Sequence, residues 1–329
     1  MKVLSPLDSA AEVDLLVDAG AAEFYCGLLD ERWHERYPVM SMNRRPAGKG
    51  HFRTFSSLRE AVMRAHDRGA QVYFTLNEHY YTAEQYEILW YYIDGALEAG
   101  IDAFIVTDFG LIASLHERQY RVALHCSTGA TVFNRRSVDF FKELGVVNIT
   151  LPRHLSVPEL RSLSAHVSGV DLTVFILNSR CVNVDGFCTF QHGLAGREIP
   201  PMYRNACMLP FQVSGFRMQD CAQPQALPQE AFQVRRQKLW ERVHVDDHPC
   251  GACALYDLYR MGIGSVKIVG RGNPLERKQK DVAFISTLIE RARCDDGDRA
   301  GFLLHARDLY IQTYERNCRA FMCYYPELL

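Results

Sequence analysis

Short apolar runs alternate with amphipathic segments along most of the chain. The apolar runs are rich in β-branched and aromatic residues and predict eight strands, at Lys2–Ser5, Glu23–Leu28, Gln71–Asn77, Ala103–Asp108, Arg121–Cys126, Asn148–Arg153, Asp171–Leu177 and Ser265–Gly270. The amphipathic segments predict helices at Ala10–Ala19, Ser57–Arg68, Thr82–Ala99, Leu111–Arg118, Arg135–Leu144, Val157–Val167, Leu255–Met261 and Pro274–Arg293. Strands that alternate with helices indicate a parallel sheet.

Eight parallel strands can close into a TIM-type (β/α)8 barrel, which is the predicted fold. A doubly wound open sheet is the alternative, but it usually carries a glycine-rich first turn, which this chain lacks. We expect one barrel over residues 1–294, including a cysteine-rich loop at 178–254, with 295–329 packing on it as a helix and tail. A polar loop rich in Arg and Gly is predicted at Asp30–Arg53.

The stretch Cys181–Cys253 holds six of the 11 cysteines in a segment with little apolar periodicity. A loop this long inside a compact domain usually has a function. Clustered thiolates can hold zinc or an iron–sulfur cluster, and the spacing leaves both open beside free buried thiols. Within this stretch, only Cys250 and Cys253 have the close spacing that is typical of structural zinc. Cys318 and Cys323 can join a site only if the tail folds back.

Polar residues follow the predicted strands, where a barrel carries its chemistry. They are Asn77, Glu78, His79, Asp108, His125, Ser127, Arg153, His154, Asn178, Lys267 and Arg271. We take four of them as candidate catalytic residues, namely His125, Arg153, Lys267 and Asp108. The cations suit an anionic substrate such as a dicarboxylate or phosphate. Two have simpler alternative roles, Asp108 as a helix N-cap and His125 as a core histidine.

The composition sets limits on partners and location. With 48% apolar and 23% charged residues and a net charge of −2, the chain resembles a soluble enzyme without the basic field expected of a DNA-binding protein. The basic run Arg271–Lys280 is the first place to look for RNA contact. No apolar run approaches the ~20 residues of a membrane span, so a cytoplasmic protein is expected. A reducing compartment favours metal or redox roles for the cysteines over disulfides.

Seven stretches within roughly residues 1 to 290 match one known pattern. They are Ala21–Gly27 (AAEFYCG), Phe52–Asn77, His125–Asn134 (HCSTGATVFN), Leu151–Leu160 (LPRHLSVPEL), Cys181–Cys188 (CVNVDGFC), Tyr203–Cys207 (YRNAC) and Ser265–Arg271 (SVKIVGR). Together they resemble the collagenase-like peptidase family U32. The chain departs from the family pattern at His154 and Val269, where the family has Glu, and at Asp185, where it has Ser.

The resemblance implies a 4Fe–4S protein of oxygen-independent hydroxylation, with prephenate as the oxygen-donating cosubstrate. Its substrate would be small and aromatic, such as a ubiquinone precursor, or an RNA base, and a homologous partner subunit is implied in one branch. Carried over by motif, three cluster ligands are Cys181, Cys188 and Cys207. In the family, sixteen residues separate the fourth cysteine from the Lys-Ile pair, which corresponds here to Cys250, with Cys253 in reserve.

Two alternatives remain beside the hydroxylation protein. The first is a collagenase-like peptidase, although the chain has no His-Glu-x-x-His or Gly-x-Ser-x-Gly motif. His125 and Cys126 are adjacent in a predicted strand and should therefore point to opposite faces, which disfavours a thiolate–histidine pair. The second is a non-catalytic partner subunit stabilised by a cluster or by zinc.

Overall fold

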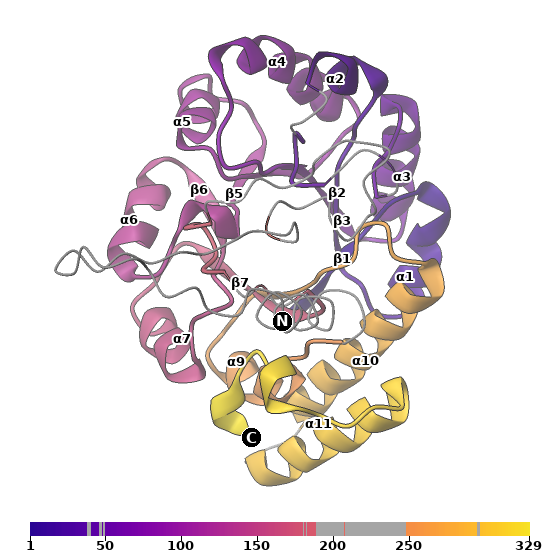
Figure 1. Ribbon diagram of the computed structural model, residues 1–329, viewed down its shortest axis with the longest axis vertical. Helices are drawn as coiled ribbons and strands as arrows, with labels where there is room; N and C mark the ends of the chain where they lie inside the picture. The colour runs from indigo at the N-terminus through magenta and orange to yellow at the C-terminus, as the bar shows by residue number, and fades with distance from the viewer. Residues whose placement is uncertain are drawn as a thin grey trace, which may run out of the picture.

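Eight parallel strands close into a barrel with helices around its outside (Figure 1). The computed structural model describes residues 1–37, 41–45, 48, 50–179, 181, 183–188, 207, 248–294 and 297–329. The strands are β1 (Lys2–Pro6), β2 (Glu23–Cys26), β3 (Gln71–Leu76), β4 (Ala103–Val106), β5 (Ala123–Cys126), β6 (Val146–Thr150), β7 (Asp171–Leu177) and β8 (Ser265–Ile268). Pairing of β1 with β8 closes the ring, so the predicted barrel is confirmed.

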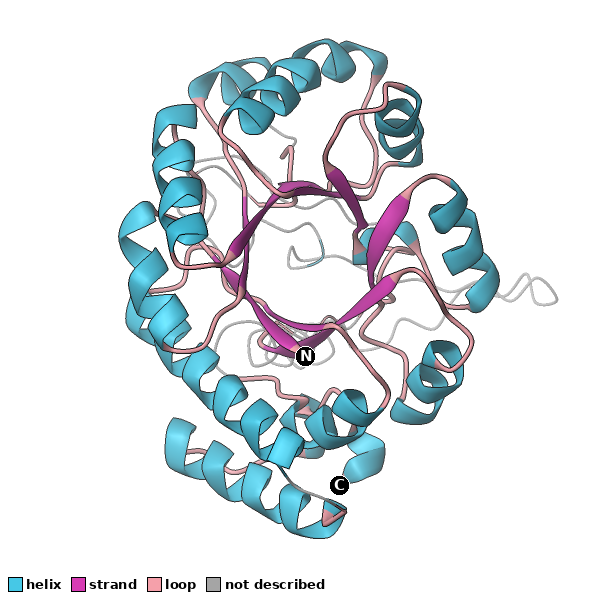
Figure 2. Ribbon diagram, turned by 180° about the vertical axis from the view of Figure 1, so that it is seen from behind, coloured by secondary structure: helices cyan, strands magenta, loops and turns pink. Residues whose placement is uncertain are grey.

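The helices that follow the strands form an outer layer (Figure 2). They are α1 (Val13–Asp18), α3 (Phe55–Asp67), α4 (Ala83–Glu98), α5 (Phe109–Glu117), α6 (Arg135–Glu143), α7 (Val157–Ser164), α9 (Leu255–Arg260) and α10 (Leu275–Cys294). Side-chain caps define several of their starts. At α4, for example, Thr82 and Gln85 bond to each other's backbone N–H groups as a capping box.

The loop predicted at Asp30–Arg53 contains a helix, so that part of the prediction is wrong. Helix α2 (Glu31–Arg36) begins where the Asp30 carboxylate accepts a hydrogen bond from the Trp33 N–H at 3.4 Å. Trp33 is only 1% exposed and packs against Tyr81 and Tyr92. One buried indole therefore stabilises a helix of two turns, which is too short to give a clear periodic pattern.

Alternate strand residues face two different environments. Outward side chains such as Phe24, Phe74 and Phe104 belong to the large core between the strands and the helices. Inward side chains form a small separate apolar cluster of Leu4, Tyr25, Tyr73, Ala103 and Ile105. The barrel interior is thus filled with side chains, and polar groups placed in it are buried.

Helix α11 (Arg299–Tyr314) follows α10, and the chain after it folds back toward the barrel (Figure 1). The Cys250 N–H donates to the Met322 carbonyl and the Tyr324 N–H donates to the Cys250 carbonyl, each at 3.0 Å. Cys250 also pairs with Leu177 at the end of β7. The tail therefore reaches the rim of the barrel where β7 ends.

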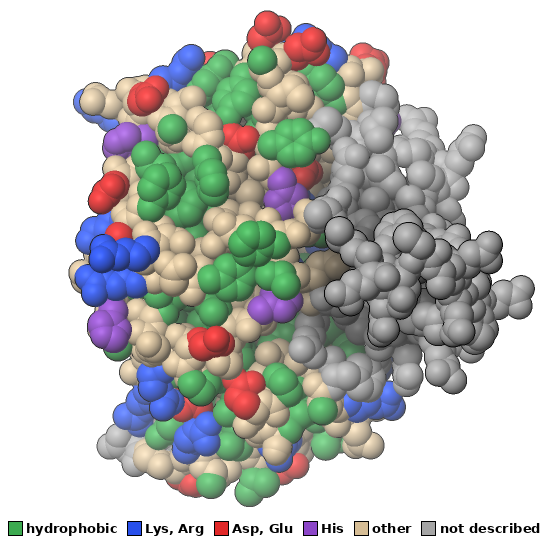
Figure 3. Space-filling view, turned by 60° about the vertical axis from the view of Figure 1, so that its left-hand side comes forward, with side chains coloured by type: hydrophobic (Ala, Val, Ile, Leu, Met, Phe, Trp, Pro, Cys, Tyr) green, Lys and Arg blue, Asp and Glu red, His purple; other side chains and the backbone are tan. Residues whose placement is uncertain are grey.

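The surface carries both signs of charge. On the face shown in Figure 3, acidic and basic side chains are interspersed with scattered apolar groups. Basic and acidic residues are nearly equal in number, which gives the net charge of −2. Within the described ranges, no helix combines the length and the apolar character that crossing a membrane requires.

A buried ion cluster joins α10 to the segment after β1, beside the seam that closes the barrel. Lys278 is 1% exposed, and its ammonium donates to Asp8 and to both carboxylate oxygens of Glu12, at 3.0 and 2.8 Å. Asp8 also accepts from the Gly272 N–H at 2.6 Å. One buried cation thus balances two carboxylates that are largely removed from water.

We predict that Lys278→Met lowers the free energy of unfolding by about 3 kcal/mol, because it leaves Asp8 and Glu12 without their cation. Equilibrium urea denaturation measures this. The matched control is Arg293→Met, which removes an exposed ion pair with Glu290 and should cost less than about 1 kcal/mol. Equal losses in the two variants would contradict the prediction.

Candidate functional site

Lys267 carries a buried positive charge inside the barrel. It points inward from β8, is 5% exposed, and holds its ammonium 4.2 Å from the centre of the Tyr25 ring. The charged neighbours that shift its pKa, Arg271, Arg153 and Arg45, are all cations. Burial and these cations lower the pKa of Lys267 to about 7. A bound anion would compensate the charge that burial and the cations disfavour.

Arg271 lies beside Lys267 and is also buried. Its Nη1 donates to Thr75 Oγ1 at 2.9 Å and its Nη2 to the Asn43 carbonyl at 2.6 Å, while its Nε has no hydrogen-bond partner among the described residues. Burial, together with Arg45, lowers its pKa to about 10. A Cβ atom on Gly27 would stand 2.5 Å from Arg271 Nη1, so the end of β2 needs glycine to accommodate this arginine.

Arg153, in contrast, is neutralised by a carboxylate. Its Nε and Nη2 donate to the two oxygens of Asp185 at 2.9 and 2.7 Å, and its backbone N–H donates to the same group at 2.9 Å. Although burial opposes ionisation, Arg153 lowers the pKa of Asp185 to about 2. The pair links the end of β6 to the start of the cysteine-rich insertion. The sequence pattern did not foresee this role for Asp185.

The loop after β2 contributes residues that the sequence analysis missed. In this loop, the Asn43 carbonyl accepts a hydrogen bond from Arg271. The charge of Arg44 acts to lower the pKa of Glu78, and the charge of Arg45 acts to lower the pKa of Lys267. Glu78 is 5% exposed and accepts hydrogen bonds from Ser41 Oγ and from the His79 N–H. Burial raises its pKa, and Arg44 opposes the rise. The Arg44–Arg45 pair, in the segment between α2 and α3, was the signal available in the sequence.

His125 lies inside the barrel, with its ring centre 4.5 Å from that of Tyr73. Burial and the nearby Lys267 and Lys2 lower its pKa to about 3, so the imidazole is neutral. Cys126 belongs to the outer core, where burial raises its pKa. The two side chains therefore point to opposite faces, as expected, and do not form a thiolate–histidine pair.

Asp108 acts as the N-cap of α5. One carboxylate oxygen accepts from the Leu111 N–H at 2.7 Å and from the Tyr86 hydroxyl at 2.5 Å. The other oxygen accepts from the Tyr81 N–H at 3.1 Å. Both oxygens are thus bonded within the fold. The hydrogen bonds of Asp108 are those of a cap, and its catalytic role stays a prediction.

Of the cysteines proposed as cluster ligands, Cys181 lies beside Arg153, and Cys250 pairs with Leu177 at the end of β7. Cys181 and Cys188 are half-buried in the insertion that follows β7, and Cys207 is buried. Burial raises the pKa of Cys181, and the Arg153 guanidinium opposes the rise. Thiolates are suitable donors for a cluster, but among the described residues no three Cys, His, Asp or Glu side chains converge at metal-binding distance. Cys221 lies outside the described residues.

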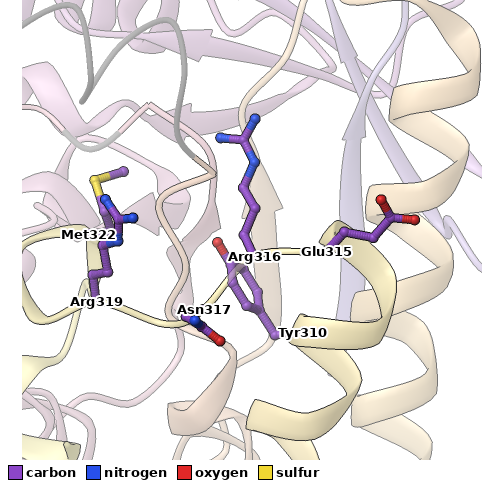
Figure 4. A pocket seen from close by; sticks show the side chains of 6 residues that line it. All are labelled: Tyr310, Glu315, Arg316, Asn317, Arg319 and Met322. Carbon is purple, nitrogen blue, oxygen red and sulfur yellow. The ribbon is translucent and has the colours of Figure 1, made fainter.

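A cavity of about 330 Å³ lies at the tail and not at the barrel mouth (Figure 4). Its lining comes from the end of α11 and the segment after it, and consists of Tyr310, Glu315, Arg316, Asn317, Arg319 and Met322. This segment also contains Cys318. The cavity is therefore a feature of the folded-back tail.

Relatives of this chain include proteins named for RNA hydroxylation and one named as an uncharacterised protease. The tRNA hydroxylation protein P of Helicobacter pylori is 26% identical over 197 residues, which cover 60% of this chain and 44% of that protein. A 23S rRNA 5-hydroxycytidine synthase of Escherichia coli is 27% identical over 159 residues, covering 48% of this chain and 24% of that protein. An uncharacterised protease of Methanocaldococcus jannaschii is 26% identical over 202 residues, covering 60% and 46%. The chain thus spans less than half the length of these three relatives.

The family assignment rests on a match along nearly the whole chain. A solved U32 peptidase is similar with a TM-score of 0.45 and 14% identity, over 83% of this chain and 94% of that one. The sequence profile of peptidase family U32 matches residues 8–327. The chain therefore belongs to peptidase family U32.

Proposed function

We propose that this protein takes part in the oxygen-independent hydroxylation of an RNA base. The observation that carries the proposal is the pair of buried cations Lys267 and Arg271 inside the barrel. Such a site suits an anionic cosubstrate, and relatives of the chain are named as tRNA or rRNA hydroxylation proteins. A peptidase is less well supported, because the described residues contain no thiolate–histidine pair at His125 and Cys126.

The cosubstrate we propose is prephenate, a dicarboxylate. Lys267 and Arg271 supply two positive charges, which match two carboxylates, and Arg153 is already neutralised by Asp185. The ring of Tyr25 lies under the Lys267 ammonium and offers an apolar wall for a hydrocarbon ring. Glu78, with its raised pKa, is the buried acid on the same rim that can hold a proton.

The cofactor we propose is a 4Fe–4S cluster, with Cys181, Cys188 and Cys207 as three of its ligands. When bound, the cluster would supply the redox chemistry of hydroxylation. Burial raises the pKa of the Cys181 thiol, and the Arg153 guanidinium partly offsets this rise. The fourth ligand we propose is Cys250, which the resemblance implies, with Cys253 in reserve.

The RNA substrate leads to a direct cellular prediction. Nucleosides from the tRNA and rRNA of cells that lack the gene should miss a hydroxylated base that the parent strain contains, as measured by mass spectrometry. Reintroducing the wild-type chain or the Lys142→Met variant should restore the base, whereas Lys267→Met should not, because Lys142 is exposed on α6 and Lys267 lies in the site. Unchanged nucleosides in the deletion strain would exclude RNA as the substrate.

Lys267 should make prephenate binding depend on pH. The pKa of about 7 means that the protonated fraction falls as pH rises through 7, so the affinity should fall by up to about tenfold per pH unit above it. Lys267→Met should weaken binding at pH 6 at least about tenfold and abolish this slope. Isothermal titration calorimetry measures both effects. Lys280→Met is the control, and equal affinities for both variants would refute the assignment.

Cluster binding predicts the metal content of the protein. Purified without oxygen, the wild-type chain should contain about four iron and four sulfide and show broad visible absorption. Cys181→Ser should remove most of both, while Cys294→Ser, at an exposed position, should leave them unchanged. A colourless wild-type protein without iron would rule out the cluster.

A further inference from the structure

The cavity of about 330 Å³ at the folded-back tail lies close to the rim of the barrel. Its lining includes Met322, whose carbonyl accepts a hydrogen bond from the Cys250 N–H at 3.0 Å, and Cys250 pairs with Leu177 at the end of β7. Tyr310 also lines the cavity, and its hydroxyl donates to the His248 carbonyl at 2.9 Å. A group bound in the cavity would therefore stand beside the barrel mouth.

The lining of this cavity is rich in hydrogen-bond donors. Arg316, Asn317 and Arg319 come from the stretch that follows α11, and all three are exposed, so a ligand can reach them from solvent. The Tyr310 hydroxyl adds a fourth polar group. Glu315 is the one carboxylate in the lining, and Figure 4 shows it on the opposite side of the group from Arg319. Two guanidinium groups and an amide suit an anion with several oxygens.

Cations from α10 gather beside the same cavity. Burial lowers the pKa of His248 to about 4, and the charges of Arg277, Arg316 and Lys280 act in the same direction. The two that come from α10 belong to the basic run that the sequence marks as the first place to look for RNA contact. Asp281 lies 4.0 Å from the Arg277 guanidinium and offsets part of its charge. Lys280 is exposed, so its charge reaches the surface.

We propose that the tail cavity binds a phosphate in the backbone of an RNA strand whose base enters the barrel mouth. This inference rests on the proposed function, in which an RNA base is the substrate. Arg316 and Arg319 supply guanidinium groups that match phosphate oxygens, and the Asn317 amide is a further donor of the kind that contacts phosphate and sugar. The volume of the cavity is near the lower end of that of small-ligand sites and suits one nucleotide.

The distribution of charge favours a strand over a small phosphorylated molecule. The cations come from two segments, with Arg316 and Arg319 on the tail and Lys280 on α10, so they can meet successive phosphates of one chain. The net charge of the whole protein is −2, so attraction for RNA must come from such a local group. Contacts to phosphate carry no sequence information and fix the position of the strand. The tail would thus align the RNA while the barrel mouth receives the base.

The salt dependence of RNA binding tests this surface. Fluorescence anisotropy with a labelled oligouridine measures the affinity of the full-length chain over a range of salt concentrations. The double variant Arg316→Met/Arg319→Met should bind roughly tenfold more weakly at low salt, and its slope of log affinity against log salt should be shallower by about 1.4, or about 0.7 for each lost phosphate contact. The control Arg59→Met/Arg121→Met removes the same charge at exposed positions on α3 and before β5, and should behave as the wild type.

Binding is measured separately from modification, so the two proposals can fail separately. Equal affinity and slope in the tail variant and the control would overturn the tail surface, even if the deletion strain lacks a hydroxylated base. Wild-type protein that binds no oligouridine would also overturn it. Loss of binding to vesicles of anionic phospholipid, with oligouridine binding unchanged, would assign the cavity to a membrane surface instead. Weaker oligouridine binding by the tail variant, with unchanged nucleosides in the deletion strain, would support the surface and count against hydroxylation alone.

Discussion

Positive charge buried inside the barrel, with no carboxylate bonded to it in the described part of the chain, is the feature on which the site depends. Lys267 and Arg271 are both nearly inaccessible, and their mutual repulsion adds to the cost of removing them from water. The fold tolerates them because Tyr25, Thr75 and the Asn43 carbonyl surround the cations. A binding anion would relieve this arrangement, so the strain is best understood as part of the affinity for a ligand.

On the same rim, the charge of Arg153 is neutralised within the fold by Asp185. Its bidentate geometry satisfies the charges internally, and the depressed pKa of Asp185 keeps the pair ionised over the physiological range. This pair can therefore hold the insertion in place without requiring a ligand. Lys267 and Arg271 thus keep a charge that a ligand would neutralise, whereas the charge of Arg153 already positions the backbone beside Cys181.

The barrel could be predicted because alternation of apolar strands and amphipathic helices is local and repeats eight times. Lys267 and His125 could be placed inside the barrel or near its mouth because each belongs to one of the predicted strands. Helix α2 was missed because its stability comes from the burial of Trp33, and the roles of Asn43 and Asp185 were missed because they arise from tertiary contacts. The bridge between Cys250 and Cys323 depends on contacts that no local pattern encodes.

The tail contact also sets an order of assembly. The backbone of Cys250 is completed by hydrogen bonds to Met322 and Tyr324, which the ribosome adds long after the strands of the barrel. The barrel can close while the rim beside β7 still lacks this cover. The tail can therefore cover this part of the rim only after the barrel strands have been made.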